Sequence, residues 1–318
     1  MNKERHKRNR DEVKDYSANL SSFSDLIDKL GRGGGFQARE VSKGLDILIG
    51  MEGDQRCTKF LSFTANLVAT GLRGVIAEAI RNNLVNVVIT TGGTADHDIA
   101  RALGGKYHLG TFFDDDARLR ERDLHRLGNI VVPLVSYGPI IEKFVRKMVD
   151  ELGNGKSFSP SELLAEAGRR LDDENSILRV AYLKGVPVIS PGIVDSAFGT
   201  ALMYGYQKGK LHLDVLKDMK LMSDKIFERK RTGAIILGGG ISKHHVLWWN
   251  QFKEGLDYVV AITTGTEFDG SLTGARISEA ISWGKVKPGA SISNIIGDAT
   301  VIFPLLLAAY YEKNIQGK

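Results

Sequence analysis

The sequence is poor in cysteine and has no long apolar run. A single cysteine, Cys57, excludes an internal disulfide and is typical of proteins in a reducing compartment. The longest apolar run, residues 301–311, contains Pro304 and is about half of the ~20 residues that a membrane span needs. The charged N-terminus is not followed by the apolar stretch of a signal peptide. We therefore expect a cytoplasmic protein without a membrane anchor.

Net charge is also scarce outside the first ten residues. The formal net charge is +5, and residues 1–10 contribute +4 of it through five Lys or Arg and one Glu. A nearly neutral body offers no broad basic surface, so we expect no nucleic-acid partner. The basic N-terminal segment is interpreted as a solvated arm.

The 318 residues do contain a strong alternation of apolar, β-branched runs with helical patterns. This rhythm predicts an α/β fold, with a Rossmann-like, mostly parallel sheet and helices on both faces. The domain prediction is an N-terminal arm and short helix over residues 1–34, followed by a catalytic domain over residues 35–318. The six main strands are expected within residues 59–66, 86–93, 186–195, 234–245, 258–270 and 293–300, and a seventh at 129–133. Helices are expected at 22–30, 71–83, 140–152, 159–171 and 213–229, with the glycines of 31–35 as a linker or turn.

Each of the six main runs ends in small or polar residues. In a parallel sheet the carboxyl ends of the strands share one edge, and ligands bind there. Glycines let the backbone approach a ligand, and helix N-termini suit phosphate, so a pyrophosphate-bearing dinucleotide is the natural candidate. No stretch matches G-x-G-x-x-G or a Walker A loop, and the alternative is that the glycine-rich endings are only tight turns. The crevice is expected to contain Asn66, Thr91, Gly92, Gly93, Asp195, residues 238–240, His244, Thr264, Asp269 and Asp298.

His244 and His245 could be combined with Asp96, His97 and Asp98 into a metal site. The spacings match no zinc motif, and adjacent histidines point in different directions, so we expect no metal. For His244 two interpretations stay open, a packed histidine and a crevice histidine that acts in acid–base chemistry or orientation.

Two lysines in the stretch Ser-Trp-Gly-Lys-Val-Lys have different surroundings. Lys285 ends a helical-looking segment and follows Trp283 and Gly284, whereas Lys287 precedes Pro288 in an apparent turn. A lysine amine is a nucleophile only when it is neutral, and desolvation beside an aromatic wall favours that form. Lys285 is therefore either an ordinary surface lysine or an imine-forming one. Glu279 could hold a cationic substrate, and residues 263–276 form either a surface loop or a binding loop.

Three blocks resemble the signature segments of deoxyhypusine synthase: GAIILGGGISKHH, TEFDGSLTGARISEAISWGK and GDATVIFP. Upstream blocks such as GFQARE and NNLVNVVITTGG resemble its earlier segments in the same order. The resemblance implies an NAD-dependent enzyme that transfers the aminobutyl group of spermidine to its own lysine. The group would then pass to a lysine of the hypusine-bearing translation initiation factor precursor. It also implies a homotetramer with active sites between subunits.

The resemblance assigns roles to individual positions. Lys285 would be the enzyme lysine, and His244 would act beside the carbon that is oxidised. Substrate contacts would come from Asp96, His97, Gly270, Glu279 and Trp283. NAD contacts would come from Ala65, Asn66, Thr91, Gly92, Gly93, Asp195, Gly240, Thr264, Gly265, Asp269, Thr273, Asp298 and Ala299.

The sequence departs from the eukaryotic pattern where acids hold the amines of spermidine. A glutamate pair is replaced by Asp96 and His97, and two further acids by Thr200 and Leu272. Asp96, Asp98 and Glu279 are the alternative amine ligands. Two other functions stay open, a homospermidine synthase-like transferase that uses a free diamine as acceptor, and a non-catalytic NAD-binding homologue.

Overall fold

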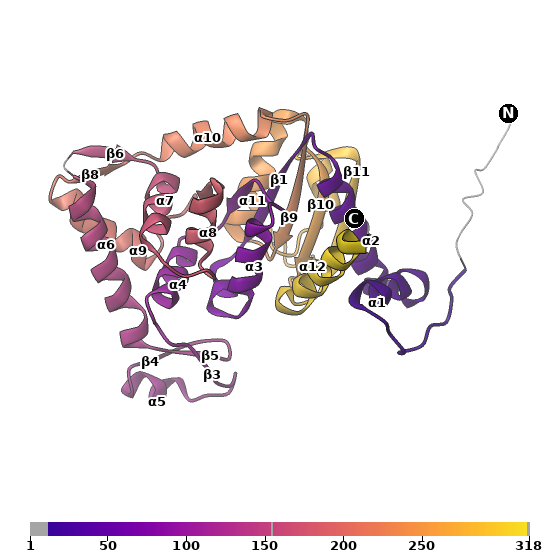
Figure 1. Ribbon diagram of the computed structural model, residues 1–318, viewed down its shortest axis with the longest axis horizontal. Coiled ribbons are helices and arrows are strands. Elements are labelled where there is room, and N and C mark those ends of the chain that lie inside the picture. Colours follow the sequence, from indigo (N-terminus) through magenta and orange to yellow (C-terminus); the bar gives the residue numbers. More distant parts are fainter. Residues whose placement is uncertain (1–11, 154, 317–318) are drawn as a thin grey trace.

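The computed structural model describes residues 12–153 and 155–316, so the basic segment 1–10 lies outside it. Its centre is a six-stranded sheet in which every pairing of neighbouring strands is parallel (Figure 1). Across the sheet the order is β11-β10-β9-β1-β2-β7. The strands are β1 (Cys57–Phe63), β2 (Val87–Ile89), β7 (Val188–Ile189), β9 (Arg231–Leu237), β10 (Leu256–Thr263) and β11 (Val286–Ile296). Each of the six predicted main strands is confirmed.

Helices cover both faces of this sheet because its strands bury side chains on both sides. In β1, Leu61 and Phe63 belong to the larger core, whereas Phe60 belongs to a second core on the opposite face. The second core is closed by α10 (Val215–Phe227) and α11 (Gly240–Asn250). The larger core is closed by α2 (Phe36–Gly53), α3 (Leu72–Arg81), α4 (Gly93–Ala102), α6 (Gly138–Leu152), α7 (Pro160–Arg170), α8 (Ile177–Lys184), α9 (Ala197–Gln207) and α12 (Ala299–Gln316). The predicted α/β fold class is confirmed.

The helix predictions at 71–83, 140–152, 159–171 and 213–229 correspond to α3, α6, α7 and α10, and that at 22–30 to α1 (Phe23–Lys29). Local signals explain their limits. Ser159 and Glu162 form a capping box at the start of α7, with Pro160 in its first turn. The apolar run 301–311 lies within α12, and no helix of the described chain is long and apolar enough to cross a bilayer.

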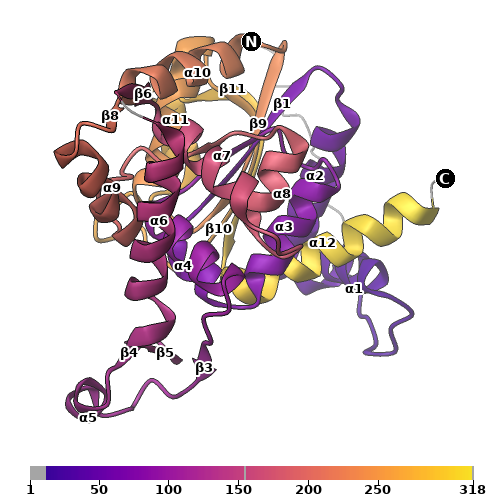
Figure 2. The ribbon, with the colours of Figure 1, turned by 60° about the vertical axis from the view of Figure 1, so that its left-hand side comes forward.

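Two small sheets lie outside the main one. The strands β3 (His108–Leu109), β4 (Leu124–Leu127) and β5 (Ile130–Pro133) form an antiparallel sheet that projects from the body together with α5 (Asp116–Glu121) (Figure 2). The predicted strand at 129–133 is β5, so it exists but does not join the main sheet. The other small sheet pairs β6 (Lys156–Phe158) with β8 (Leu211–Leu213).

Two local predictions are wrong. Residues 31–34, expected in a linker or turn, belong to the π-helix η1 (Leu30–Gly34), which extends α1 directly. Lys287, expected in a turn, lies in β11, where its ammonium pairs with Asp257 of β10 at 2.9 Å. Pro288 is compatible with a strand here because β11 is an edge strand. The predicted division between residues 34 and 35 falls between η1 and α2, and as a domain boundary it stays a prediction.

Candidate active site

The strand order reverses direction between β1 and β9. From β1 the chain proceeds to β2 and β7 on one side, and from β9 to β10 and β11 on the other. Counted along the chain this is the order 3-2-1-4-5-6 of dinucleotide-binding sheets, whose ligands bind at the reversal. A hollow of about 320 Å³ lies at this point, lined by residues that follow β1, β9, β10 and β11. Of the predicted crevice residues it contains Asn66, residues 238–240, Thr264 and Asp298, and of the NAD contacts implied by the resemblance it also contains Thr273 and Ala299.

Two helix N-termini at this edge have no side-chain cap. They belong to α11, preceded by Gly239, and to α4, preceded by Gly92. In contrast, Asp96 accepts hydrogen bonds from the first turn of α9, and Asp98 from that of α8. Uncapped N–H groups and the positive end of the helix dipole favour an anion. The start of α11, which borders the hollow through Gly239 and Gly240, therefore fits the pyrophosphate of a dinucleotide, whereas the start of α4 does not line this hollow.

Glycine is required at the end of β9 by a close approach of backbone. A Cβ on Gly239 would lie 2.4 Å from the Cα of Thr273, so only glycine lets the loop 264–276 close over the strand end. The next residue, Gly240, has φ +66 and would meet nothing within 4 Å, so it borders the hollow. The glycine-rich turn thus both packs against the loop and exposes the start of α11.

The other predicted cofactor residues occupy three different settings. Ala65 donates its N–H to Thr91 Oγ1 at 3.1 Å, and a Cβ on Gly93 would contact Ala65, so the ends of β1 and β2 meet there. Gly265 lines a neighbouring hollow. Asp195 and Asp269, predicted to contact NAD, and Gly270, predicted to contact the substrate, are exposed and outside both hollows, and these contacts stay predictions.

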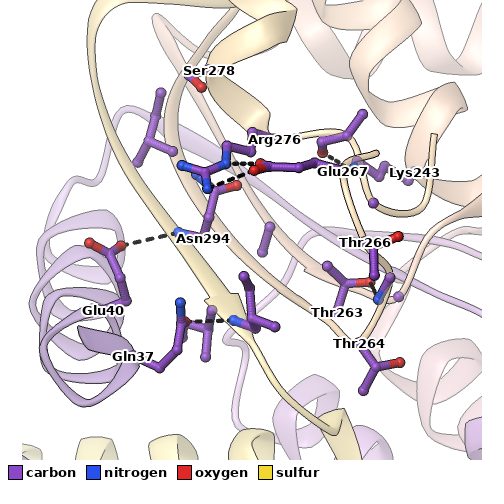
Figure 3. Close-up of a pocket in the computed structure, with 18 of the residues that line it drawn as sticks. Gln37, Glu40, Lys243, Thr263, Thr264, Thr266, Glu267, Arg276, Ser278 and Asn294 are labelled. Carbon is purple, nitrogen blue, oxygen red and sulfur yellow. Dashed lines mark hydrogen bonds and ion pairs between the residues drawn. The ribbon is translucent and has the colours of Figure 1, made fainter. Parts of the chain in front are cut away.

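The neighbouring hollow, of about 430 Å³, separates α2 from the loop 264–276 (Figure 3). Gln37 and Glu40 of α2 accept hydrogen bonds from the backbone of β11 and so cover its open edge. Across the hollow, Arg276 forms an ion pair with Glu267. Lys243, 2% exposed, donates to the carbonyl of Ala275 at 2.7 Å. Burial lowers the pKa of Lys243 to about 8, against the opposing negative charge of Glu279.

Lys285 lies between two indole rings. Its Nζ is 5.2 Å from the ring centre of Trp283 and 5.8 Å from that of Trp248. Its backbone is fixed on both sides, since its N–H donates to Ala280 and its carbonyl accepts from Leu256. The side chain is half-buried, and the segment before it is the 3₁₀ helix η5 (Ile277–Ile281). The backbone of Lys285 is thus fixed by hydrogen bonds and its amine faces two aromatic rings, whereas the amine of Lys287 forms an ion pair.

His244 is on the exposed face of α11, beside Lys285. Its ring stacks on Trp248, with centres 5.8 Å apart and planes at 20°. Desolvation, and then the positive charge of Lys285, lowers the pKa of His244 below its usual range. Its imidazole is therefore neutral near pH 7 and can accept a proton. His245 points elsewhere, against Trp249.

Glu279 and Trp283 precede Lys285 in the chain by six and two residues, and both are exposed. The Glu279 carboxylate makes no hydrogen bond or ion pair within the described chain, although its charge acts on Lys243. An exposed carboxylate without a protein partner is available for an amine.

Asp96 and His97 are instead engaged inside the protein. Asp96 accepts hydrogen bonds from Ala197, Phe198 and Tyr137, and burial raises its pKa. His97 Nδ1 lies 2.8 Å from the Tyr107 hydroxyl, and burial lowers its pKa to about 4. Their contacts organise the fold around α4, and their predicted substrate contacts stay predictions.

Asp98 is also removed from the set of amine ligands that the sequence left open. Its buried carboxylate bonds to Arg73, Ser176 and the start of α8, and each oxygen has protein donors. The interpretation of Asp98 as an amine ligand is wrong because no oxygen faces a crevice unpaired.

The sequence reasoning missed Trp248 and Lys243. Trp248 follows His244 by four residues, and on a helix that spacing places two side chains on one face. Lys243 carried no signal, because only the structure shows it buried under the loop.

Comparisons with known proteins find one family over nearly the whole chain. A family model described as deoxyhypusine synthase matches residues 25–310. A protein of Sulfurisphaera tokodaii named "Probable deoxyhypusine synthase" is 54% identical over 303 residues, covering 94% of this chain and 96% of its own. One of the same name from Ignicoccus hospitalis is 51% identical over 298 residues, covering 92% of each. A crystal structure from Entamoeba histolytica, described under the same family name, has a TM-score of 0.64 at 19% identity and covers 95% of this chain and 96% of its own, which shows the fold alone.

Proposed function

The chain belongs to the deoxyhypusine synthase family, and from this premise we propose that it catalyses an NAD-dependent aminobutyl transfer. The donor is spermidine, and the acceptor is one lysine of the hypusine-bearing translation initiation factor precursor. The observation that carries the proposal is the position of Lys285, held between Trp248 and Trp283 and beside His244.

The hollow at the strand reversal fits NAD. The uncapped start of α11 borders this hollow and suits its pyrophosphate, and Asp298 and Thr264 border the same hollow. When bound there, NAD supplies the acceptor for the hydride removed from spermidine and returns the hydride at the end of the reaction. The adjoining residues Asn66, Gly240 and Thr273 shape the hollow that would hold it.

The chain's own residues carry the proton and group transfers. Neutral His244 accepts the proton lost from the amine as the carbon is oxidised. The Lys285 amine attacks the resulting imine carbon, its new C=N bond forms, and 1,3-diaminopropane leaves with the proton. The acceptor lysine then displaces Lys285 in the same way, which regenerates the free enzyme amine.

Glu279 is the proposed ligand for an amine of spermidine. Its carboxylate, six positions before Lys285 in the chain, has no hydrogen-bond or ion-pair partner in the described chain, whereas the carboxylates of Asp96 and Asp98 do. A charged hydrogen bond from an ammonium to Glu279 would contribute about 1.5–3 kcal/mol.

The remaining parts of the proposal concern the oligomeric state and the cellular location. We propose a cytoplasmic homotetramer with active sites between subunits. Exposed Ile241, Trp248 and Phe252 on and just after α11 support it, because large apolar side chains beside a site favour a protein contact there.

The test is an acceptor experiment. The protein is incubated with NAD and spermidine labelled in its aminobutyl part, with either the translation factor or putrescine. The proposal expects label in the factor, and label only in putrescine would instead identify a homospermidine synthase-like enzyme. No transfer to either acceptor, with NAD still bound, would identify a non-catalytic homologue. Lys285→Ala should abolish transfer and leave NAD affinity within about twofold, because only the nucleophile is removed.

A further inference from the structure

Trp248 is a large aromatic side chain that the family resemblance gives no role, yet it faces the reactive amine. The Trp248 side chain, on helix α11, is 43% exposed, and that of Trp283 is 67% exposed. The two rings come from segments 35 positions apart in the chain and approach the same atom, Lys285 Nζ. Packing of the hydrophobic core does not explain why the two rings meet, because neither ring is buried in the core.

The orientation of Trp248 is fixed by its neighbours. His244, one turn earlier on α11, stacks on one side of the ring, and Phe252, one turn later, makes an edge contact with centres 6.1 Å apart. The face of the indole is the part that attracts a cation, and attraction is effective within about 6 Å of the ring centre. Both rings lie within that distance of the Lys285 nitrogen.

Counter-charges are few at this position. The Lys285 nitrogen forms no ion pair within the described chain, and the carboxylates of Asp96 and Asp98 accept hydrogen bonds from other parts of the protein. Glu279 is the nearby carboxylate without a protein partner in the described chain, and it is assigned above to a substrate amine. A positive charge on the Lys285 nitrogen therefore meets aromatic faces rather than an ion-pair partner.

We propose that Trp248 and Trp283 form a two-indole cation site that stabilises the protonated imine between Lys285 and the aminobutyl chain. The inference rests on the proposed function, since that function places a C=N bond on this nitrogen. When the bond forms and 1,3-diaminopropane leaves, the protonated nitrogen carries one positive charge at the position that Nζ has here. Trp248 is thereby a catalytic residue beside the reacting nitrogen. It adds a second aromatic ring to Trp283, the tryptophan that the family resemblance assigns to the substrate.

The experiment measures the covalent adduct at equilibrium. Wild-type protein with NAD and labelled spermidine, without an acceptor, is treated with borohydride, and the label fixed on the protein is counted. Removing one ring of a cation–π pair worth about 0.5–2 kcal/mol lowers the adduct by about 2- to 30-fold, so Trp248→Leu should fall in that range. Trp248→Phe, which keeps a weaker aromatic face, should lie between Trp248→Leu and wild type.

Two controls separate this effect from misfolding. Tyr182→Leu removes an aromatic ring of similar exposure, 40%, on the remote helix α8 and should keep the wild-type adduct level. NAD affinity of the Trp248 variants should equal that of wild type, because the ring does not line the cofactor hollow.

The outcomes are distinguishable. Adduct in wild type with an unchanged level in both Trp248 variants would overturn the two-indole site and leave the proposed function intact. Equal loss of adduct in Trp248→Phe and Trp248→Leu would also overturn it. Such a result would mean that Trp248 only fills space, because a cation site would retain more adduct with an aromatic side chain than with an aliphatic one. Absence of any adduct in wild type would reject the proposed function, and the inference with it.

Discussion

The first turns of α4 and the segment from η5 into β11 use their charged groups in opposite ways. In α4, Asp96 and Asp98 are buried and every carboxylate oxygen accepts a hydrogen bond from the protein. In the second segment, Glu279 and Trp283 are exposed, and the Lys285 ammonium is met by ring faces. Groups satisfied within the chain fix the scaffold, and groups left unsatisfied at a strand edge are available to a ligand.

This contrast bears on the proposed amine site, because the chain lacks several acids of the eukaryotic pattern. Acids that resemble substitutes in the sequence, such as Asp96 and Asp98, serve helix starts instead. The proposed function therefore assigns the amine to Glu279 and to the aromatic faces beside Lys285. If the contrast holds, substitutions of the α4 carboxylates should lower the unfolding free energy, and substitutions in the segment from η5 into β11 should lower the activity.

The largest effect is expected from Asp98→Asn. Removing the charge from a buried ion pair leaves Arg73 without its main partner, which typically costs about 3–5 kcal/mol of unfolding free energy. Denaturant unfolding measures it. The matched control is Asp116→Asn, which breaks the surface pair with Arg126 and should lower the unfolding free energy far less than Asp98→Asn, because solvent screens this pair. Equal losses in the two variants would remove the distinction between scaffold and surface carboxylates.

Glu279→Gln should affect catalysis and not stability. Loss of one charged hydrogen bond to an ammonium, worth about 1.5–3 kcal/mol, raises KM for spermidine about 10- to 150-fold. Unfolding free energy should change by less than about 0.5 kcal/mol, because the carboxylate is exposed. Glu142→Gln on α6 is the control for loss of an exposed acid. An unchanged KM would mean that another group holds the amine.

Acid should destabilise the α4 region through His97. Burial lowers the pKa of His97 to about 4, whereas the unfolded chain has its ordinary value near 6.5. Between these values the unfolded state binds more protons, so stability falls as the pH drops from about 6.5 to 4, by up to about 1.4 kcal/mol per pH unit. His97→Gln should flatten this slope, leaving the part due to His244 and His245, whose pKa values are also lowered, and His108→Gln, at an exposed position, is the control. An unaltered slope in His97→Gln would place the acid sensitivity elsewhere.

The smallest effect is expected from Lys287→Ala. Its partly buried ion pair with Asp257 contributes no more than about 1 kcal/mol, and it has no aromatic pair around it in the described chain. The borohydride-fixed adduct should equal that of wild type. A loss of adduct comparable to that of Lys285→Ala would show that the two lysines are not functionally distinct.

The sequence predicted the parts of the molecule that follow repeating local rules. The six strands with polar endings place Asn66, Gly240, Thr264 and Asp298 at one edge, as the alternation of strands and helices indicated. Local sequence patterns do not reveal which distant residue will hydrogen-bond to a buried polar side chain. The carboxylate of Asp98 is engaged by Ser176, 78 residues away, so nothing near position 98 could reveal it. Lys287 similarly became a strand residue through a partner on β10, despite Pro288 beside it.

The most direct test of the central claim is the location of the covalent intermediate. Protein incubated with NAD and spermidine is reduced with borohydride, digested, and mapped by mass spectrometry for a lysine that carries an aminobutyl group. The modified residue is expected to be Lys285, with Lys243 and Lys287 unmodified. An adduct on either of those lysines, or none on Lys285 while transfer to an acceptor proceeds, would contradict the account.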